Sequence, residues 1–304
     1  MRVGKQEERK RFAVIGTPIK HSLSAVLHTA VFEKLELPWQ TELIDPGDSE
    51  SFVRLIEGMC AGSVDYQGAN ITIPYKETAL PLCDELLTSA ACCQAVNTLF
   101  CDKAEHKLIG ANTDVGGFLE ALKLQLNIDA ANLHHVVLCG TGGAARAIAS
   151  GLVSAGVSEL TVLSRTDHRA ANFVESLRCE HGQTTWRGVS YADISRVIDP
   201  DERFDLGINA TPLGMLGDSN QEMPKEWLAL VRRQVRKLFD VVYRRGGPTT
   251  LVQWAREQRI PATDGLAMLI EQAILSLRLW GVEAEPDELR AIMREALADE
   301  GIVL

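Results

Sequence analysis

The 304-residue chain contains no run of about 18 consecutive apolar residues, the length that a membrane-spanning helix needs. Its first residues, Met1–Phe12, are mostly charged and lack the apolar stretch of a secretory signal, so we expect a cytoplasmic protein. The formal net charge of −10 disfavours general binding to nucleic acid or anionic lipid. We therefore expect neither a nucleic-acid partner nor a membrane partner.

Signatures of disulfide-rich and metal-binding proteins are also missing. The seven cysteines are odd in number and none forms a CxxC pair, which favours reduced thiols over a disulfide framework or a zinc ribbon. Cys92 and Cys93 are interpreted as core packing at a helix end. The sequence has no HExxH motif and no cluster of histidine and cysteine, so we expect no metal site. His21 and His28 are interpreted as structural residues.

What is present is the composition of a folded chain with room for two domains, since 46% of the residues are apolar and 24% are charged. Short β-rich runs alternate with helical patterns, which predicts an α/β fold with parallel sheets. In the first part of the chain we expect strands at 12–15, 41–44 and 68–73, a hairpin over 96–110, and helices at 25–35, 50–59 and 78–91.

A second α/β unit is expected to begin with the apolar strand 135–139, which runs directly into a glycine loop and a helix ending near Ser154. Further strands are expected at 160–163, 205–209 and 238–242. This pattern predicts a doubly wound, Rossmann-like nucleotide-binding domain over 116–262. The C-terminal helices, the last of which begins near Pro286, are expected to return to the first domain, which then comprises 1–115 and 263–304.

The glycine loop, Gly140-Thr-Gly142-Gly143-Ala144-Ala145-Arg146, lies between a strand and a helix. Glycines at this place allow a tight turn and let backbone N–H groups approach a pyrophosphate, while the helix N-terminus favours its negative charge. No Gly-Lys-Ser/Thr sequence follows, which disfavours a P-loop kinase or ATPase.

The end of the next strand distinguishes the two nicotinamide cofactors. NAD-binding proteins often carry a carboxylate there for the ribose 2′-hydroxyl. This chain carries Ser164, Arg165 and Thr166, with Arg169 four residues after Arg165. Guanidinium and hydroxyl groups suit a 2′-phosphate, which a carboxylate would repel. The pattern therefore favours NADP.

Polar residues also follow the strands of the first part of the chain. Asn70 and Thr72 alternate with apolar residues on the strand before Lys76, which indicates the edge of a cleft, the alternative being a solvated edge strand. Small hydrogen-bonding groups stand at other strand and loop ends, which suits a polyhydroxylated, anionic small molecule. These are Ser22, Ser24, Asn97, Asn112, Thr113 and Asp114.

Seven segments together resemble the shikimate dehydrogenase family, in the order in which that family carries them. They are Val14–Ser24 (VIGTPIKHSLS), Gly68–Lys76 (GANITIPYK), Ala95–Thr98 (AVNT), Asn112–Asp114 (NTD), Gly140–Arg146 (GTGGAAR), Asn209–Met215 (NATPLGM) and Asp264–Gln272 (DGLAMLIEQ).

The resemblance implies reversible, NADPH-dependent reduction of 3-dehydroshikimate to shikimate, a step of chorismate and aromatic amino-acid biosynthesis. It implies that Lys76 and Asp114 are catalytic, with Lys76 the acid in reduction and the base in oxidation. It also implies that 1–115 with 263–304 binds substrate and that 116–262 binds NADP. The implied substrate-binding residues are Ser22, Ser24, Asn70, Thr72, Asn97, Asp114, Tyr243 and Gln272. The implied cofactor-binding residues are Gly140, Gly142, Gly143, Ala144, Ser164, Arg165, Thr166, Arg169, Asn209, Thr211, Gly265 and Met268.

Two alternatives remain open at this point. Gln94 stands where the family usually has glycine, which leaves a quinate/shikimate dehydrogenase or another paralogue acting on a related cyclohexane carboxylate. A non-catalytic dinucleotide sensor would have the same fold, although Lys76 and Asp114 count against it. The expected partner is the small-molecule substrate, and the chain is expected to be a monomer or a homodimer.

Overall fold

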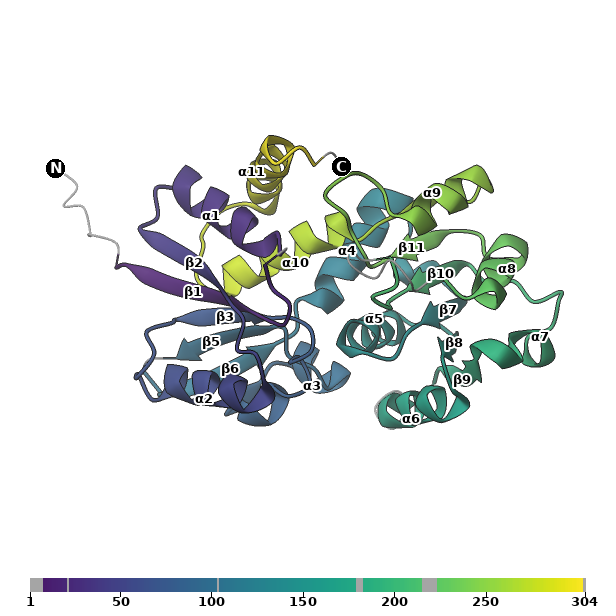
Figure 1. Cartoon of the computed structure of the whole chain (residues 1–304), viewed down its shortest axis with the longest axis horizontal. Helices are drawn as coiled ribbons and strands as arrows, with labels where there is room; N and C mark the ends of the chain where they lie inside the picture. The colour runs from purple at the N-terminus through teal and green to yellow at the C-terminus, as the bar shows by residue number, and fades with distance from the viewer. Residues whose placement is uncertain (1–7, 21, 103, 179–182, 215–222, 303–304) are drawn as a thin grey trace. The chain divides into compact units, whose positions relative to one another are not determined.

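The computed structural model describes residues 8–20, 22–102, 104–178, 183–214 and 223–302. The chain divides into two compact units, one formed by Met1–Thr113 with Gln272–Val303 and the other by Asp114–Glu271. We call them unit 1 and unit 2 and describe each by itself (Figure 1). Within the described residues, no helix has the length and apolar character of a membrane span.

Unit 1 is built on a six-stranded mixed sheet with the order β2-β1-β3-β5-β6-β4. β1, β2, β3 and β6 run in the same direction, β5 and β6 form an antiparallel hairpin, and β4 pairs parallel to β6. The strands are β1 (Lys10–Ile15), β2 (Trp39–Ile44), β3 (Gly68–Ile71), β4 (Glu85–Leu86), β5 (Thr98–Asp102) and β6 (Lys107–Ala111). Its helical elements are α1 (Ser24–Lys34), α2 (Ser49–Cys60), η1 (Leu80–Leu82), α3 (Thr88–Cys93), most of α10 (Leu266–Leu279) and α11 (Pro286–Asp299).

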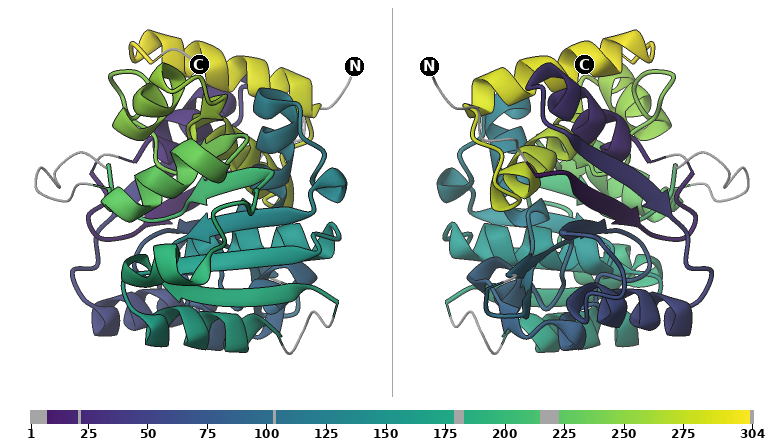
Figure 2. Two further views of the ribbon diagram at one scale, coloured as in Figure 1. Left: turned by 90° about the vertical axis from the view of Figure 1, so that its right-hand side faces the viewer. Right: turned by 90° about the vertical axis from the view of Figure 1, so that its left-hand side faces the viewer.

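Side chains of β1 and β3 alternate between two cores, as the period of two in a strand requires. Ala69 and Ile71 face an apolar core that contains Phe52 and Ile56 of α2. The preceding residues, Gly68 and Asn70, face α10. The C-terminal helices thus complete the first unit, as expected, and α11 packs against α1, beside the N-terminal strands in Figure 2.

An aromatic cluster fixes the end of the α10 segment to this sheet. The ring of Trp280 stacks on Phe12 of β1 with centroids 4.4 Å apart, and its Nε1 donates to the Leu99 carbonyl oxygen of β5 at 3.1 Å. Gly68 allows this approach, because a Cβ there would lie 2.5 Å from Trp280 Nε1. His28 of α1 meets Trp280 edge-on and is fully buried.

Unit 2 is a six-stranded parallel sheet with the order β12-β11-β10-β7-β8-β9, a doubly wound arrangement. Its strands are β7 (His135–Cys139), β8 (Glu159–Ser164), β9 (Thr185–Ser190), β10 (Leu206–Asn209), β11 (Leu238–Asp240) and β12 (Ala262–Thr263). Its helical elements are α4 (Asp114–Leu126), η2 (Ala130–Asn132), α5 (Gly143–Ser154), α6 (Asp167–Arg178), η3 (Tyr191–Asp193), α7 (Ile194–Val197), α8 (Lys225–Gln234) and α9 (Thr250–Glu257).

Helices cover both faces of this sheet (Figures 1 and 2). Val136 and Leu138 of β7 point into a core shared with α4, α5 and α6. Val137 and Cys139 point into a second core shared with α7, α8 and α9. A strand that is buried on both faces reads as a continuous apolar run, which is why the sequence of β7 shows no polar alternation.

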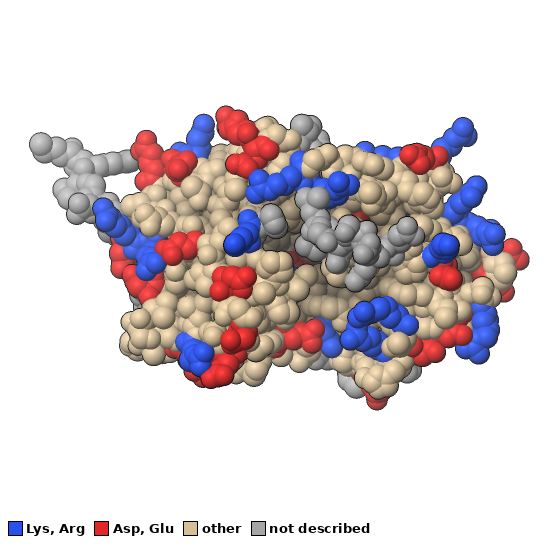
Figure 3. Space-filling view, viewed as in Figure 1, with Lys and Arg blue, Asp and Glu red and all other residues tan. Residues whose placement is uncertain are grey.

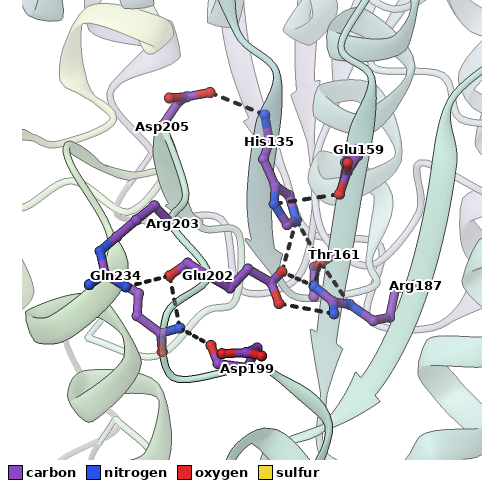
Figure 4. Close-up of polar contacts among 9 residues, drawn as sticks. All are labelled: His135, Glu159, Thr161, Arg187, Asp199, Glu202, Arg203, Asp205 and Gln234. Atoms are coloured by element: carbon purple, nitrogen blue, oxygen red, sulfur yellow. Dashed lines mark hydrogen bonds and ion pairs between the residues drawn. The ribbon is translucent and has the colours of Figure 1, made fainter.

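A cluster of charges holds together the amino ends of these parallel strands (Figure 4). Arg187 of β9 pairs with both carboxylate oxygens of Glu202 and donates to Thr161 Oγ1 at 2.9 Å. His135 lies 3.4 Å from Glu202, and burial is the main cause that lowers its pKa. The opposite, carboxyl edge of the sheet is therefore the edge left to loops that can bind a ligand.

Two expectations about elements are wrong, and one open alternative is removed. The helix expected over 78–91 is instead η1, β4 and α3, because Pro81 opens a short 3₁₀ turn and the next residues pair with β6 through Asp84 N to Leu108 O and Leu87 N to Gly110 O. The strand expected at 68–73 ends at Ile71. β3 is an interior strand, which removes the alternative of a solvated edge strand. The short strands β4, β9 and β12 were not anticipated.

Gln94, the residue that stands where glycine is usual, ends α3 in the left-handed conformation with φ of 52°. Glycine adopts this conformation at no steric cost, which explains the family's preference. The side chain compensates in part, since Gln94 Nε2 donates to the Ala91 carbonyl oxygen at 2.7 Å.

The fully buried His28 predicts a loss of stability in acid. Neither ring nitrogen has a hydrogen-bond partner among the described residues, and burial lowers the pKa of His28 from 6.5 to about 3. Between these two pH values His28 is protonated in the unfolded chain but neutral in the folded chain. Protonation therefore favours the unfolded state, and the free energy of unfolding decreases as pH falls below 6.5. We expect His28→Leu to flatten the fall in the free energy of unfolding between about pH 6.5 and 4 in urea titrations.

The control is His168→Gln, which changes an exposed histidine on α6 and should leave the wild-type slope intact. A His28→Leu curve that runs parallel to the wild-type curve over this range would show that the buried imidazole is not the acid-sensitive group.

Candidate active site

Four chain segments meet at the carboxyl edge of the unit 1 sheet. β1, β3 and β6 point the same way, so the loops after Ile15, Ile71 and Ala111 all leave from this edge. β5 runs in the opposite sense and begins here with Thr98. The segments after β1, β3 and β6 and before β5 carry five of the eight sequence-predicted substrate residues, while Asn70 lies on β3 itself, Tyr243 after β11 and Gln272 on α10.

The backbone of 95–97 ties three of these segments together. Val96 N donates to the Lys76 carbonyl oxygen at 2.8 Å, and Ile71 N donates to the Asn97 carbonyl oxygen at 2.7 Å. Asn97 N in turn donates to the Ala111 carbonyl oxygen at 3.0 Å. Residues between 71 and 111, in three segments of the chain, are thus held at one place.

The loop after β1 lies against the loop after β3. Thr17 N donates to the Ile73 carbonyl oxygen at 2.9 Å, and a Cβ on Gly16 would lie 2.3 Å from Thr72 Cγ2. Ser22 follows in the loop and its Oγ accepts from Ser24 N at 3.3 Å, at the start of α1. Ser22 and Thr72 are half-buried, and Ser24 is buried.

Buried amide and hydroxyl side chains form a hydrogen-bonded network at this edge of the sheet. Asn97 Nδ2 donates to Thr113 Oγ1 at 3.0 Å, and Thr113 N donates to Asn97 Oδ1 at 2.7 Å. Asn112 Nδ2 donates to the Ala95 carbonyl oxygen at 2.9 Å. Thr113 Oγ1 also lies 3.4 Å from Gln272 Oε1 of α10. These reciprocal bonds fix the orientation of side chains that have left bulk water.

The two predicted catalytic residues follow segments of this network. Lys76 is half-buried in the turn after β3, and its carbonyl oxygen is held by Val96. Asp114 is buried at the first position of α4 and follows directly on Thr113, which Asn97 holds. Both predicted positions are thus set by the 95–97 segment.

The glycine loop of unit 2 combines a tight turn with open space in front of a helix. Gly140 has a φ of 122°, and a Cβ there would lie 2.8 Å from the Ala210 carbonyl oxygen after β10. Gly142 is the N-cap of α5, and a Cβ there would meet no atom within 4 Å. The first glycine is therefore required by the turn, whereas the second leaves open space in front of the helix N-terminus. Gly143 and Ala144 form the first turn of α5 and are half-buried.

The segment after β8 is organised by short side chains. The buried Ser164 Oγ donates to the Thr166 carbonyl oxygen at 2.6 Å, and Thr166 Oγ1 accepts from Arg169 N in the first turn of α6. Arg165 lies in the bend before α6 and Arg169 in the first turn of that helix, so their four-residue spacing is not one continuous helical turn. Asp167 turns toward the sheet and accepts from Ser190 N at 2.9 Å.

A pocket of about 330 Å³ lies between the glycine loop and α6. Arg146 and Arg169 both line it, and the Arg146 guanidinium lies 5.5 Å from the ring centroid of Phe173. Figure 3 shows Lys and Arg side chains over the part of the surface where Figure 1 places α5 and α6. Two guanidiniums beside a helix N-terminus fit a phosphorylated dinucleotide. The pocket is lined by Thr141, Gly142, Arg146, Arg169, Asn172 and Phe173.

A buried carboxylate supports the next loop at this edge. Asp240 Oδ1 accepts from Asn209 Nδ2 at 2.8 Å, and Asp240 Oδ2 accepts from Thr249 Oγ1 at 2.6 Å. Asn209 Oδ1 then accepts from the backbone N–H and hydroxyl of Thr211. Burial is the main cause that raises the pKa of Asp240 to about 6. These bonds set the direction in which the chain leaves β10.

The remaining predicted residues, Tyr243, Gly265 and Met268, have different surroundings. Tyr243 is half-buried in the loop after β11. Gly265 permits a close backbone approach, since a Cβ would lie 2.0 Å from the Val241 carbonyl oxygen. Met268 packs in the apolar core with Phe118 and Phe239, which is sufficient reason for an apolar residue there. His21 and Met215, which belong to the family-like segments, lie outside the described residues.

Sequence reasoning missed four residues that the structure brings into these networks. Thr98 and Ser276 join the buried network of unit 1, Arg146 lines the pocket of unit 2, and Asp240 supports Asn209. Only Arg146 carried a usable signal, because it is a charge in the first turns of a helix that follows a phosphate-binding loop. No group of three or more potential metal ligands occurs within the described part of the chain.

The doubly wound unit 2, with its glycine loop and basic pocket, is the arrangement of dinucleotide-binding α/β proteins, the class that includes the NAD(P)-dependent oxidoreductases. Comparison with known proteins identifies the family: residues 14–99 match the shikimate dehydrogenase substrate binding domain. A curated shikimate dehydrogenase (NADP(+)) from Gloeothece citriformis is 33% identical over 95% of this chain and 96% of its own length. The chain belongs to the shikimate dehydrogenase family.

Solved structures agree with this assignment. The Thermus thermophilus shikimate 5-dehydrogenase in complex with NADP(H) and shikimate is 31% identical, covers 94% of this chain and 99% of its own, and has a TM-score of 0.74. The Listeria monocytogenes shikimate 5-dehydrogenase in complex with shikimate and NAD is 26% identical, covers 96% and 99%, and has a TM-score of 0.78. The expected fold class is confirmed.

The glycine loop yields a prediction with an internal control. We expect Gly140→Ala to lower the free energy of unfolding by about 2 kcal/mol or more, because the alanine would be strained and would collide with the Ala210 backbone. We expect Gly142→Ala to change that free energy by less than about 1 kcal/mol. Gly142→Ala should instead raise the KM for NADPH, because its methyl group enters the space in front of the α5 N-terminus.

Thermal and urea unfolding, together with steady-state kinetics, measure both effects. Equal destabilisation by the two variants, or a Gly142→Ala enzyme with the wild-type KM for NADPH, would contradict this assignment of the loop.

Proposed function

We propose that this protein catalyses the reversible, NADPH-dependent reduction of 3-dehydroshikimate to shikimate. The observation that carries the proposal is the convergence of buried amides and hydroxyls at the carboxyl edge of unit 1, within the segment that matches the family's substrate binding domain. Such an edge suits a ring that bears several hydroxyl groups. Unit 2 supplies the dinucleotide site.

The substrate is proposed to be held by residues on the four converging segments. Ser22 and Ser24 after β1 and Thr72 after β3 offer hydroxyl groups on two neighbouring loops. Hydroxyl donors of this kind suit the substrate carboxylate. Asn70, Asn97 and Gln272 offer amide groups to the ring hydroxyls, with Tyr243 as a further contact.

In the proposed mechanism, Lys76 acts as the general acid during reduction. NADPH, when bound, supplies the hydride that reduces the carbonyl carbon. Negative charge then develops on the carbonyl oxygen, and the Lys76 ammonium stabilises this charge and gives the oxygen its proton. Asp114 orients the ammonium by hydrogen bonding. In the direction of oxidation, neutral Lys76 takes the hydroxyl proton.

The dinucleotide is proposed to lie along the carboxyl edge of unit 2. The loop 140–144 would hold the pyrophosphate, while Ser164, Arg165, Thr166 and Arg169 would hold the 2′-phosphate. The pocket that Arg169 lines with Arg146 supports this placement. Asn209, Thr211, Gly265 and Met268 are proposed to form the side nearer the nicotinamide.

A second candidate is a dehydrogenase that accepts NAD as well as NADP and a related cyclohexane carboxylate such as quinate. The observation that favours it is the Listeria structure, whose described ligands are shikimate and NAD. Measurement of kcat/KM for shikimate and quinate with each cofactor distinguishes the two candidates. NADP-linked oxidation of shikimate at the highest kcat/KM supports the first.

Lys76→Ala is expected to reduce kcat for shikimate oxidation by about 10²- to 10⁴-fold, the usual contribution of a general acid–base group. The KM for shikimate should change much less, because the polar side chains that bind the substrate remain. The control is Lys107→Ala, which removes a lysine of β6 that pairs with Glu105 and should leave kcat unchanged. A Lys76→Ala enzyme that retains near-normal kcat would end the assignment of Lys76.

Arg169→Ala is expected to raise the KM for NADPH about tenfold and to leave the KM for NADH nearly unchanged, because only NADPH carries the 2′-phosphate. Arg165→Ala should act in the same direction. The preference for NADPH should shrink in high salt, since both arginines are exposed and salt screens exposed charge pairs. Arg196→Ala, on α7, is the control. An equal rise in KM for both cofactors would place Arg169 away from the 2′-phosphate.

A further inference from the structure

Ser276 of α10 lies at the centre of the buried network of unit 1, although nothing in the sequence pattern singles it out. Its side chain is fully buried, and its Oγ donates to the Gln272 carbonyl oxygen at 3.0 Å. The same oxygen accepts from Asn70 Nδ2 at 2.9 Å. It also lies 2.9 Å from Thr98 Oγ1 and 3.1 Å from Thr113 Oγ1. One hydroxyl therefore links α10 to β3, β5 and the segment after β6.

The partners of Asn70 determine which way its amide points. Nδ2 faces the Asn97 carbonyl oxygen at 3.2 Å, Thr98 Oγ1 at 3.0 Å and Ser276 Oγ. A carbonyl oxygen can only accept, so the nitrogen of the amide must lie on this side. The proton of Ser276 goes to Gln272 and that of Thr98 goes to Asn97 Oδ1, which leaves both hydroxyl oxygens as acceptors for Asn70.

This orientation leaves Asn70 Oδ1 without a hydrogen-bond partner among the described residues, although the atom is buried. Only 5% of the residue is exposed. A buried acceptor without a donor is unfavourable and is rare in native proteins. Asn70 is the penultimate residue of β3, beside the proposed substrate edge, and a ring hydroxyl of the substrate is a donor that would satisfy its Oδ1.

We propose that Ser276 is a positioning residue for substrate recognition: it holds the amide of Asn70 so that Oδ1 accepts a hydrogen bond from a ring hydroxyl of the substrate. This inference rests on the proposed function and adds a residue that touches no substrate. Without the Ser276 hydroxyl, the two N–H groups of the amide keep only Thr98 Oγ1 at 3.0 Å and the Asn97 carbonyl oxygen at 3.2 Å, so the shortest of the three contacts is lost and the orientation that presents Oδ1 becomes less favoured.

The test compares Ser276→Thr, which keeps the hydroxyl, with Ser276→Val, which has the same shape and lacks it. Ser276→Ala is the third variant, in case the added methyl group disturbs the packing. We expect Ser276→Val and Ser276→Ala to weaken shikimate binding about three- to tenfold, with kcat within about twofold and NADPH binding unchanged. Ser276→Thr should restore most of the affinity. The matched control is Ser150→Ala, which removes an equally buried serine from α5.

A second measurement distinguishes positioning of Asn70 from general structural support. It uses the dissociation constants of two shikimate analogues, each of which lacks one of the two ring hydroxyls that do not react. For the analogue without the hydroxyl bound by Asn70, wild type and Ser276→Ala should bind with equal affinity. The other analogue should keep the full three- to tenfold difference. Dissociation constants come from calorimetric titration of the whole enzyme.

The possible results separate the two proposals. A wild-type enzyme that neither binds nor oxidises shikimate overturns the proposed function. A wild-type enzyme that oxidises shikimate, with a Ser276→Ala variant of unchanged affinity, overturns the positioning role alone. The role is also overturned if Ser276→Ala weakens the binding of shikimate and of both analogues by the same factor. A loss of affinity that does not depend on either hydroxyl would show a general disturbance of the site.

Discussion

The backbone of residues 95–97 is the constraint on which the candidate substrate site depends. Its peptide groups bond to Ile71 and Lys76, at the end of β3 and in the turn after it, and to Ala111, at the end of β6. The Asn97 side chain adds Thr113 to this set. Backbone bonds of this kind are satisfied only when the segments take one arrangement, so a single short segment sets the positions of Lys76 and of the residues that lead to Asp114.

Unit 2 uses a buried carboxylate for a comparable purpose. Asp240 leaves water at a cost that raises its pKa, and the hydrogen bonds from Asn209 and Thr249 offset part of that cost. Removing one partner would leave a buried charge less well solvated, which ties the loop after β10 to the loop after β11. In both units, polar groups that are expensive to bury lie at the carboxyl edge of the sheet, which is the edge where the loops of such folds bind ligands.

The sequence predicted the elements whose signals are local. The apolar strand before Gly140, the alternation on β3 and the turn between β5 and β6 all follow from neighbouring residues. The region 78–91 was misjudged because its apolar spacing suits a helix, while the hydrogen bonds that decide its structure come from β6. The family resemblance named the candidate site residues, yet it carried no information on what holds them.

The role of Ser276 could not be predicted for the same reason. On the sequence it is a small polar residue within an apolar helix, and its partner Asn70 lies 206 positions away. Arg146 and Arg169 did carry local signals, but the pocket that they line joins α5 to α6 only once the β7–β8 pair has formed. Long-range hydrogen bonds leave no periodic signal in the chain, whereas amphipathic faces do.

The spacing of residues along α10 matches the spacing along β3, which explains how one helix can contribute both to packing and to substrate recognition. Four residues of a helix rise about 6 Å, and two residues of a strand advance about 6.6 Å. Trp280 therefore lies against Gly68, and Ser276, one turn earlier, lies against Asn70. One turn earlier again, Gln272 Oε1 of α10 lies 3.4 Å from Thr113 Oγ1 in the same network. The stacked ring of Trp280 on Phe12 anchors this register at the apolar end, so the aromatic contact determines where the polar residues of α10 stand at the carboxyl edge.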